Sequence, residues 1–409
     1  MKTQVSVRDF YERLPYPPPV DHLGEQRDGY ANQLRQRAWF HRMWPGRPLE
    51  GNQKILIAGC GTAQGARYAL RHPEAHVTAI DISETSLRHT VHLQRTYHLD
   101  NLDVHRLALE DVKELGSAFD AIVCTGVLHH LSAPDIGLRA LRDVLEPGGA
   151  IHLMVYAPYG RAGIYMMQEY CRMLGIGTSA DDLRELHGLL DLLPREHALA
   201  GLLRHAKDFR EPYAMADALL HPMDRAYTVP ELYAWLPRCG LSFGRWVEQA
   251  PYLAQCGLVA ESPHAARLAA LPPRLQHAAV ELFRGTMVSH SLIAYRDDCL
   301  ELSQPIDANG EGWTAFVPIP MPWTICIRER VPAGSVAVLI NRAHTCTDLV
   351  LRVDAFEDQL LARIDGERTV ADIVEAAPRH AAGERRALRF FERLWQYDQI
   401  VFDASPAVG

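Results

Sequence analysis

Short apolar runs alternate with helical stretches between residues 54 and 156. One helical stretch, 83–98, starts at Ser83, a residue type that caps helix N-termini, and has Glu84 in its first turn. Apolar strands separated by helices are typical of a parallel sheet that is covered on both faces. The pattern therefore predicts a doubly wound α/β domain. The predicted strands are 54–59, 76–81, 102–107, 119–126 and 150–156.

Less regular segments surround these strands. Residues 134–149 have the pattern of a helix with a Pro-Gly-Gly stop, and residues 241–248 and 289–297 have the pattern of strands that complete the sheet. Residues 307–312, DANGEG, have the composition of a linker. We expect an N-terminal helical segment, the α/β domain, a helical cap inserted in it, and a small C-terminal α+β domain of winged-helix type. Their expected ranges are 1–50, 51–300, about 158–240 and 313–405.

Composition narrows the classes of function. The chain has 409 residues, enough for two or three domains, and 48% of them are hydrophobic and 22% charged, as in ordinary globular proteins. The 42 basic and 50 acidic residues give a net charge of −8, which disfavours binding to nucleic acid. No apolar run approaches 18 residues, and the N-terminus lacks a signal-peptide pattern. None of the eight cysteines forms a Cys-x-x-Cys pair, so we expect a reduced, cytoplasmic protein. From the absence of a long apolar run we also expect that the protein does not bind a membrane.

A glycine-rich turn follows the first predicted strand. In the stretch IAGCGTAQG, Gly59 and Gly61 let a ligand approach the backbone and the N-terminus of the next helix. Asp81 ends the second predicted strand, where an acidic side chain can accept hydrogen bonds from both hydroxyls of a ribose. A glycine pair alone could mark an ordinary tight turn, but the two features together indicate a site for a nucleoside-containing ligand.

Four segments resemble, in their order and spacing, the successive motifs of class I S-adenosylmethionine-dependent methyltransferases. They are ILIAGCGTAQG, VTAIDIS, FDAIVCTGVLHHL and LEPGGAIHLMVY. The third, with its paired histidines, is similar to the form found in ubiquinone-biosynthesis-type members. The resemblance is strong over about residues 50–157 and weak as far as about residue 300. It implies a mostly parallel sheet of the seven-stranded type, with S-adenosylmethionine as cofactor and S-adenosylhomocysteine as product.

The resemblance also implies which residues hold the cofactor. The glycine-rich turn would lie along the methionine and ribose, Asp81 would bind the ribose diol, and Ile82 would pack on the adenine. Leu109 and Glu110 would flank the adenine edge, and the end of the fourth strand would line the methionine side. The ten expected residues are Gly59, Cys60, Gly61, Asp81, Ile82, Leu109, Glu110, Cys124, Thr125 and Gly126.

Two positions depart from the family pattern. Ile57 stands where an acidic residue is common, and Ala63 stands where a third glycine is usual. The ammonium group of the cofactor would therefore need another partner, such as a backbone carbonyl near Gly59 or Thr125. This departure bears on the affinity for the cofactor rather than on its identity.

A nicotinamide-dependent oxidoreductase is the alternative interpretation of the turn. The spacing Gly59-x-Gly61-x3-Gly65 is one residue longer than the dinucleotide fingerprint. The chain has four lysines, and none follows a tyrosine at the Tyr-x-x-x-Lys distance found in short-chain dehydrogenases. Both observations favour the methyltransferase interpretation.

Methyl transfer from a sulfonium is an in-line displacement in which the protein mainly holds the acceptor and excludes water. A base is needed only if the acceptor must lose a proton, and histidine suits that role. His129 and His130 follow the fourth predicted strand and are the catalytic candidates, although either ring could instead cap a helix or hydrogen-bond in the core. No third ligand has a recognisable spacing, so we expect no metal.

The acceptor pocket is expected from the less regular segments. Tyrosines in the proline-bounded N-terminal segment could fold over the cofactor as a lid. A second group follows the fifth strand, at the carboxyl edge where ligands bind in such folds. A third group lies in a polar loop of the cap that also contains Asp224. Each candidate of the three groups could instead take part in core packing or in a local ion pair. The candidates are Tyr11, Tyr16, Tyr156, Tyr159, Arg161, His221, Arg225 and Tyr227.

The C-terminal segment weakly resembles small winged-helix domains that bind leader peptides, and it could instead be a structural or dimerising module. Glu384 and Glu392 among its basic residues make DNA binding an unfavourable interpretation. We expect S-adenosylmethionine-dependent methyl transfer to a small molecule. The alternatives are a peptide or protein methyltransferase that docks its acceptor on the C-terminal domain, and a non-catalytic cofactor-binding scaffold. The sequence leaves the oligomeric state open.

Overall fold

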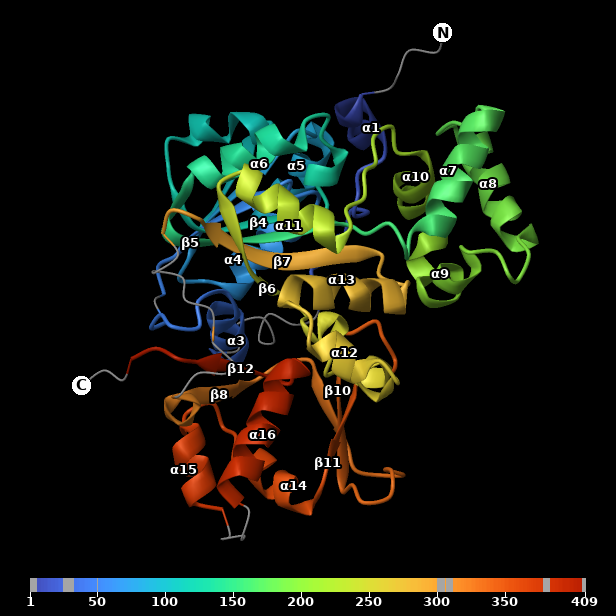
Figure 1. The fold of residues 1–409 in the computed structure, drawn as a ribbon. Helices are drawn as coiled ribbons and strands as arrows, with labels where there is room; N and C mark the ends of the chain where they lie inside the picture. Colours follow the sequence, from blue (N-terminus) through green and yellow to red (C-terminus); the bar gives the residue numbers. More distant parts are fainter. Residues whose placement is uncertain are drawn as a thin grey trace.

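A seven-stranded sheet with the strand order β3-β2-β1-β4-β5-β7-β6 forms the centre of the molecule (Figure 1). β1 to β5 pair in parallel, whereas β7 is antiparallel to both of its neighbours. The strands are β1 Lys54–Ala58, β2 His76–Asp81, β3 Leu102–Arg106, β4 Phe119–Thr125, β5 Leu145–Tyr156, β6 Leu241–Trp246 and β7 Ser289–Arg296. The predicted doubly wound, mostly parallel sheet is confirmed, and so are the two late strands that complete it. The computed structural model describes residues 6–24, 33–49, 51–299, 306, 312–377 and 383–406.

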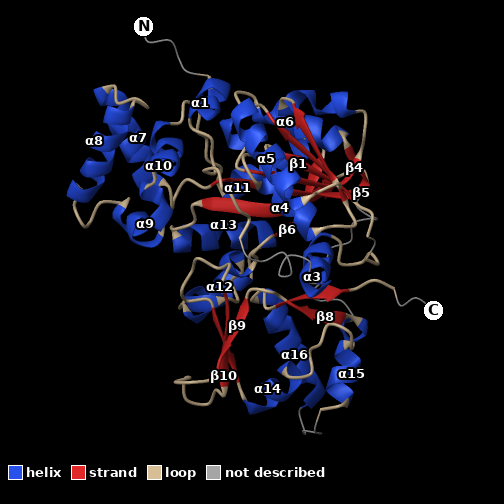
Figure 2. Cartoon of the chain, turned by 180° about the vertical axis from the view of Figure 1, so that it is seen from behind, coloured by secondary structure: helices blue, strands red, loops and turns tan. Residues whose placement is uncertain are grey.

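Both faces of the sheet are buried, because successive residues of each strand point to opposite sides. Ile55 and Ile57 of β1 belong to the hydrophobic core on one face, and Leu56 and Ala58 belong to the core on the other. Helices that contribute to the two cores cover the sheet on both sides (Figure 2). The helices on the first face are α3 Gln33–Met43, α4 Gln64–Arg71 and α5 Glu84–Tyr97. Those on the second face are α6 Pro134–Asp143, α11 Val229–Arg238 and α13 Pro273–Arg284.

The start of β5 differs from the sequence prediction. Helix α6 ends at Asp143, and residues 145–149 belong to the strand rather than to the helix, because Leu145 pairs with Phe119 of β4. The register then shifts, and Gly148, with a φ of 77°, lies within this irregular stretch. The Pro-Gly-Gly sequence therefore bends a strand, and the prediction that it stops a helix is wrong.

Four helices beside the sheet form the cap, which has a core of its own. Phe10 of the N-terminal helix α1 (Val7–Arg13) inserts into this core, so α1 packs on the cap (Figure 1). The expected cap range, about 158–240, also includes α11, but that helix packs on β6 and covers the sheet. The cap helices are α7 Ala162–Leu174, α8 Ala180–Leu192, α9 Ala200–His205 and α10 Pro212–Leu220.

The C-terminal part is α+β. A three-stranded antiparallel sheet with the order β11-β10-β9 precedes three helices, and β8 pairs with the last strand, β12. The elements are β8 Val317–Pro320, β9 Thr324–Ile327, β10 Ala337–Asn341, β11 Val350–Val353, α14 Ala355–Leu361, α15 Val370–Glu375, α16 Gly383–Gln396 and β12 Ile400–Asp403. The winged-helix assignment stays a prediction.

Asp398 joins this C-terminal part to the α/β domain. Its carboxylate accepts a hydrogen bond from the Ala250 N–H at 2.9 Å and lies 3.4 Å from the Arg245 guanidinium. Of the predicted linker 307–312, all but Gly312 lies outside the described residues. In the part of the chain that the structure describes, no helix has the length and apolar character needed to cross a bilayer.

Candidate functional site

The glycine-rich turn connects β1 to α4. The N–H groups of Gly59 and Cys60 both donate to the Ile80 carbonyl at 2.9 Å, which holds the turn against the carboxyl end of β2. Gly59 has a φ of 74°, and a Cβ at this position would overlap the Val127 side chain from the loop after β4. Only glycine therefore allows the two loops to approach so closely.

Asp81 ends β2 and accepts hydrogen bonds from the backbone of the turn. Its Oδ2 accepts from the Gly61 N–H and its Oδ1 from the Ser83 N–H, both at 2.9 Å. Burial raises the pKa of Asp81, against the opposing effect of these two bonds. Each carboxylate oxygen retains a lone pair after these bonds. The fixed carboxylate beside the glycine-rich turn therefore fits a nucleoside with a free ribose diol.

The other expected cofactor residues fall into three groups. Thr125 ends β4 and Gly126 follows it: the Thr125 hydroxyl accepts from Gln64 Nε2 at 2.9 Å, and the Gly126 N–H donates to the Met154 carbonyl at 3.2 Å. Three further residues have side chains buried in the hydrophobic cores, so mainly their backbone atoms could face a ligand. Two others have partly exposed side chains. The buried three are Cys60, Leu109 and Cys124, and the partly exposed two are Ile82 and Glu110.

Helix α1 is attached to the first turn of α5, directly after Asp81. The Glu12 carboxylate accepts hydrogen bonds from the Glu84 N–H at 2.8 Å and from the Thr85 N–H at 3.0 Å, and the Thr85 hydroxyl donates to it at 2.8 Å. A carboxylate at a helix N-terminus pairs with otherwise unsatisfied N–H groups and with the positive end of the helix dipole. Glu12 therefore fixes α1 beside the expected ribose site.

The segment after α1 continues across the glycine-rich turn. The Thr62 hydroxyl donates to the Pro17 carbonyl at 2.9 Å, and the Tyr16 carbonyl lies against Gly61, 3.0 Å from where a Cβ would be. The N-terminal segment thus covers the turn, as a lid would, and the role of Tyr16 in such a lid stays a prediction.

A buried group of polar side chains, which we call the polar cluster, lies at the carboxyl ends of β4 and β5. Its central residue, Asp217 of α10, accepts hydrogen bonds from the Tyr11 hydroxyl at 2.9 Å and from the Tyr156 hydroxyl at 3.3 Å. Burial raises the pKa of Asp217, which the two hydroxyl bonds counteract. Asp217 therefore joins α1, β5 and the cap. The polar cluster consists of Tyr11, His129, His130, Tyr156, Arg161, Asp217, His221 and Asp224.

An ion pair closes one side of the polar cluster. Arg161 Nη2 lies 2.8 Å from Asp224 Oδ2, and the two side chains are only 6% and 3% exposed. The Arg161 guanidinium also lies over the Tyr156 ring, 3.4 Å from its centroid, and Gln168 Nε2 donates to Asp224 at 2.9 Å. Asp224 is thus paired with Arg161, whereas Asp217 has the hydroxyls of Tyr11 and Tyr156 as its hydrogen-bond partners among the described residues.

The backbone of Met223 binds two adjacent imidazoles, which are tilted by 33° to each other. His130 Nδ1 lies 2.7 Å from the Met223 carbonyl, which can only accept, so Nδ1 carries the hydrogen and Nε2 is unprotonated. The Met223 N–H donates to His221 Nδ1 at 3.1 Å, so in the neutral ring the hydrogen is on Nε2. Burial lowers the pKa of His130 to about 4 and that of His221 to about 3, so both rings are neutral at pH 7.

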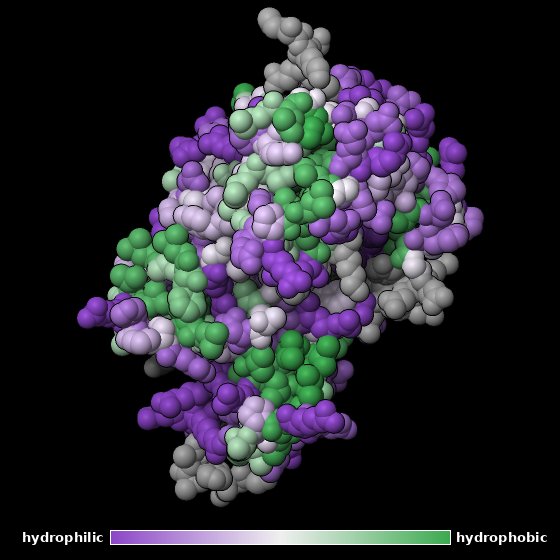
Figure 3. Space-filling model, turned by 90° about the vertical axis from the view of Figure 1, so that its right-hand side faces the viewer, coloured by the Kyte–Doolittle hydropathy of each residue, from purple (hydrophilic) through white to green (hydrophobic). Residues whose placement is uncertain are grey.

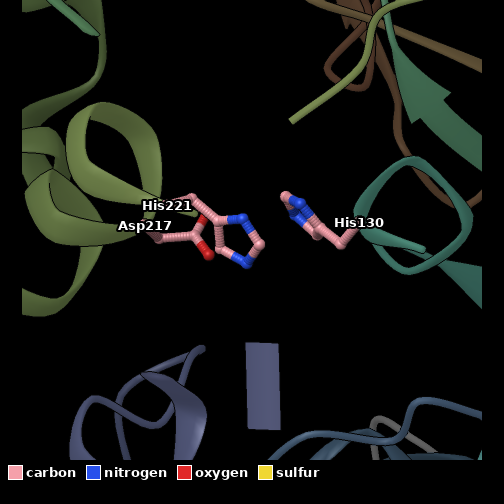
Figure 4. Close-up of side chains that lie close together, drawn as sticks. All are labelled: His130, Asp217 and His221. Atoms are coloured by element: carbon pink, nitrogen blue, oxygen red, sulfur yellow. The ribbon is translucent and has the colours of Figure 1, made fainter. Parts of the chain in front are cut away.

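Three residues of the polar cluster could be taken for a metal site. Asp217 and His221 project from the cap toward His130 on the opposite side, with potential ligand atoms within 4.8 Å of one another (Figure 4). A metal ion needs a lone pair from each imidazole. His221 Nε2 carries a hydrogen because Met223 occupies Nδ1. This donor set therefore does not fit a metal ion.

Four buried polar atoms of the cluster have no hydrogen-bond partner among the described residues. They are both ring nitrogens of His129, whose ring packs on Tyr156 at a centroid distance of 3.7 Å, together with His221 Nε2 and Asp224 Oδ1. An unpaired buried polar group costs about 1–3 kcal/mol. A polar ligand or ordered water is therefore expected at this place.

Four of the predicted acceptor residues lie outside the polar cluster. One of them is Tyr16, whose carbonyl lies against Gly61. Tyr159 is 40% exposed, Arg225 is exposed, and Tyr227 is buried in the core, stacked on Trp235 at 4.6 Å. The sequence prediction missed Asp217, Gln168 and Met223. A signal for Asp217 exists, because it is the one acidic residue in the apolar helix PYAMADALL and precedes His221 by four residues, which places both on one helix face.

Comparison with known proteins agrees with this geometry. Residues 56–151 match the family model of the methyltransferase domain. An uncharacterized protein of Synechococcus sp. is 34% identical over 250 residues, which are 58% of this chain and 58% of that protein. The ubiquinone biosynthesis O-methyltransferase of Chromobacterium violaceum is 34% identical over 102 residues, 24% of this chain and 41% of that enzyme. The chain thus spans about two fifths to three fifths of the length of these curated relatives.

PKMT2 from Rickettsia typhi has a similar structure, with a TM-score of 0.65 and 14% identity over 95% of this chain and 77% of that chain. Its complex with AdoHcy aligns with a TM-score of 0.60. The strand order and the family match define the class: this is the fold of a class I S-adenosylmethionine-dependent methyltransferase.

Proposed function

We propose that the chain transfers a methyl group from S-adenosylmethionine to a small-molecule acceptor bound at the polar cluster. The observation that carries the proposal is the set of unpartnered buried atoms beside the expected cofactor site. Tyr11 connects the expected cofactor site to the polar cluster, because its carbonyl accepts from the Ser83 hydroxyl at 3.2 Å and its own hydroxyl donates to Asp217. Helix α1 and the cap would exclude water from the reacting groups.

The cofactor, when bound, supplies a methyl group on a positively charged sulfur. The turn at Gly59 and Gly61 would lie along its methionine and ribose, and Asp81 would accept from the ribose hydroxyls. The polar cluster would hold the acceptor in line with the methyl group, which is the main source of acceleration in such a displacement. His129 and His130 are the candidates for a base.

Two measurements test this function. Binding to the native state alone raises the melting temperature, so S-adenosylhomocysteine should raise it and NAD should not. The purified protein is then incubated with methyl-labelled S-adenosylmethionine and cell extract, and the products are separated into small-molecule and macromolecular fractions. Label in the small-molecule fraction supports the proposal. Binding of S-adenosylhomocysteine without any transfer would instead support a non-catalytic scaffold.

A peptide or protein acceptor is the second candidate, favoured by the C-terminal part. Strand β9 lies at the edge of its sheet and exposes Ile325 and Ile327 beside Trp323, and such an edge can pair with an extended peptide. Apolar residues also gather in patches on the side of the molecule that carries the cap helices (Figure 3). Label in the macromolecular fraction, lost on Ile325→Lys substitution, would favour this candidate.

A further inference from the structure

Two adjacent imidazoles of the polar cluster carry opposite hydrogen-bonding groups at their Nε2 positions. His130 offers an unprotonated Nε2, whereas His221 offers an Nε2–H that is buried and has no partner among the described residues. We propose that the methylated atom is a hydroxyl oxygen, which accepts a hydrogen bond from His221 and gives its proton to His130. This inference rests on the proposed function and specifies its substrate class.

The two rings are close enough to share one ligand atom. Their centroids are 3.8 Å apart, and one nitrogen of each ring lies within 4.8 Å of the other and of a carboxylate oxygen of Asp217. The bound hydroxyl oxygen would lie at an ordinary hydrogen-bond distance of about 2.8 Å from each Nε2. The bound hydroxyl would satisfy the one His221 atom that is left unpaired.

A hydroxyl has the complementary set of groups, whereas an amine or a carbon acceptor does not. Its oxygen has two lone pairs, so it can accept from His221 with one and attack the methyl carbon with the other. An amine has a single lone pair, which it needs for the attack, and its N–H groups would face the N–H of His221. A carbon nucleophile would leave the buried His221 N–H without a hydrogen-bond partner, which is unfavourable in free energy. The pair of histidines therefore selects oxygen.

The chemical step balances without another reactant. The hydroxyl oxygen forms a bond to the methyl carbon while the carbon–sulfur bond breaks, and the electron pair of that bond stays on sulfur. The hydroxyl proton moves to His130 Nε2. The products are a methyl ether, a neutral sulfide and a protonated His130, which returns its proton to solvent when the site opens.

Asp217 makes His130 a better base during this step. When His130 gains the proton, its new positive charge lies within 4.8 Å of the Asp217 carboxylate. Asp217 is held there by the hydroxyls of Tyr11 and Tyr156, and the Arg161 charge in the same cluster is paired with Asp224. An ionised Asp217 carboxylate would therefore stabilise the imidazolium as it forms.

Substitutions that preserve the bonds to Met223 test the two roles separately. In His130→Asn the amide can still donate to the Met223 carbonyl, but the base at the Nε2 position is absent. We expect turnover with the small-molecule fraction of cell extract to fall at least 10²-fold while the Kd for S-adenosylhomocysteine, measured by calorimetry, stays within twofold. An unchanged turnover would overturn the role of His130.

The matched pair at position 221 tests the donor. His221→Gln places an amide N–H near the former Nε2–H, whereas His221→Asn keeps only the acceptor for Met223. We expect His221→Asn to raise the KM at least tenfold and His221→Gln to recover much of the loss. Equal losses in both variants would contradict the proposed donor, since they would mark the ring as structural.

The product identifies the methylated atom directly. Labelled product from the small-molecule fraction is heated with hydriodic acid under conditions that cleave methyl ethers and leave N-methyl and C-methyl groups intact. Release of the label as volatile methyl iodide supports a hydroxyl acceptor. A non-volatile labelled product would overturn this inference while leaving the proposed methyltransferase function standing. Absence of any labelled product would count against the proposed function itself.

Discussion

His130 and His221 lie with their ring centroids 3.8 Å apart, and the two rings are held in opposite tautomers by the same residue. The Met223 carbonyl accepts from one ring and the Met223 N–H donates to the other. A single residue of the cap region therefore decides which nitrogen of each ring carries the hydrogen. Which ring has a donor and which has an acceptor at Nε2 follows from the hydrogen bonds to the backbone and does not depend on a charged neighbour.

This relationship predicts two distinct signatures in nitrogen NMR. In protein labelled with ¹⁵N-histidine at pH 7, His130 should be protonated at Nδ1 and His221 at Nε2. Both rings should be neutral, because burial lowers the pKa of each to about 4 or below. Assignment comes from the spectra of His130→Asn and His221→Asn. The same tautomer in both rings would contradict the described hydrogen bonds.

The Asp81 carboxylate should supply a measurable share of the affinity for S-adenosylhomocysteine. Asp81→Ala removes the expected acceptor for the ribose hydroxyls and the two bonds to the Gly61 and Ser83 N–H groups. We expect the variant to lose about 1–3 kcal/mol of binding free energy in calorimetry. Asp103→Ala removes an exposed carboxylate that pairs with His76 on the outer side of β2, and it is the control. An unchanged Kd in Asp81→Ala would refute the ribose assignment.

Helix α1 should loosen when its bonds to α5 are removed. Glu12→Ala deletes the acceptor of the Glu84 and Thr85 N–H groups, which resembles the loss of a helix cap and should cost about 1 kcal/mol. Hydrogen exchange of the amides in α1 should accelerate by about fivefold, while exchange in β1 should not change. Glu12→Gln keeps one acceptor oxygen, so its exchange rates in α1 should lie between those of the parent protein and those of Glu12→Ala. Uniform acceleration across the chain would indicate global rather than local loosening.

The strands of the α/β domain could be predicted from the sequence because most are buried on both faces, so that their apolar runs are continuous. The start of β5 could not, because Gly148 and Gly149 are common both after helices and in irregular strands. The sequence prediction includes no strand at the position of β8 or of β11, each of which is four residues long. Asp217 was missed for another reason: its partners Tyr11 and Tyr156 are distant in the sequence, and only the packing of α1 and the cap brings them together.

Arg161 and Asp224 should be strongly coupled in stability. Arg161→Met leaves the buried Asp224 carboxylate with Gln168 as its remaining side-chain partner and should lower the free energy of unfolding by about 3–5 kcal/mol. Asp224→Asn removes the carboxylate charge that Arg161→Met leaves unpaired. The double variant Arg161→Met/Asp224→Asn should therefore recover part of the lost free energy of unfolding. Denaturant unfolding of the four proteins gives the coupling energy as a double-mutant cycle. Additive effects would mean that the pair makes no net contribution.

Buried histidines should make the protein less stable in acid. Burial lowers the pKa of His152 to about 3, with a smaller contribution from Arg42, and in the unfolded chain the pKa is about 6.5. Below pH 6.5 the unfolded chain therefore binds a proton that the folded protein does not bind, and stability falls as the pH falls. The expected loss is about 2 kcal/mol for this histidine between pH 6.5 and 5.

His152→Gln isolates this effect from the other titrating groups. The variant cannot take up the proton, and its amide can replace the ring in the contact with the Ser291 hydroxyl, which is 2.8 Å from His152 Nε2. We expect the variant to be less stable than the parent at pH 7, because the buried ring is lost, and the difference to shrink by about 2 kcal/mol at pH 5. Denaturant unfolding at both pH values measures the two differences. Parallel stability curves would show that His152 is protonated in the folded protein as readily as in the unfolded chain.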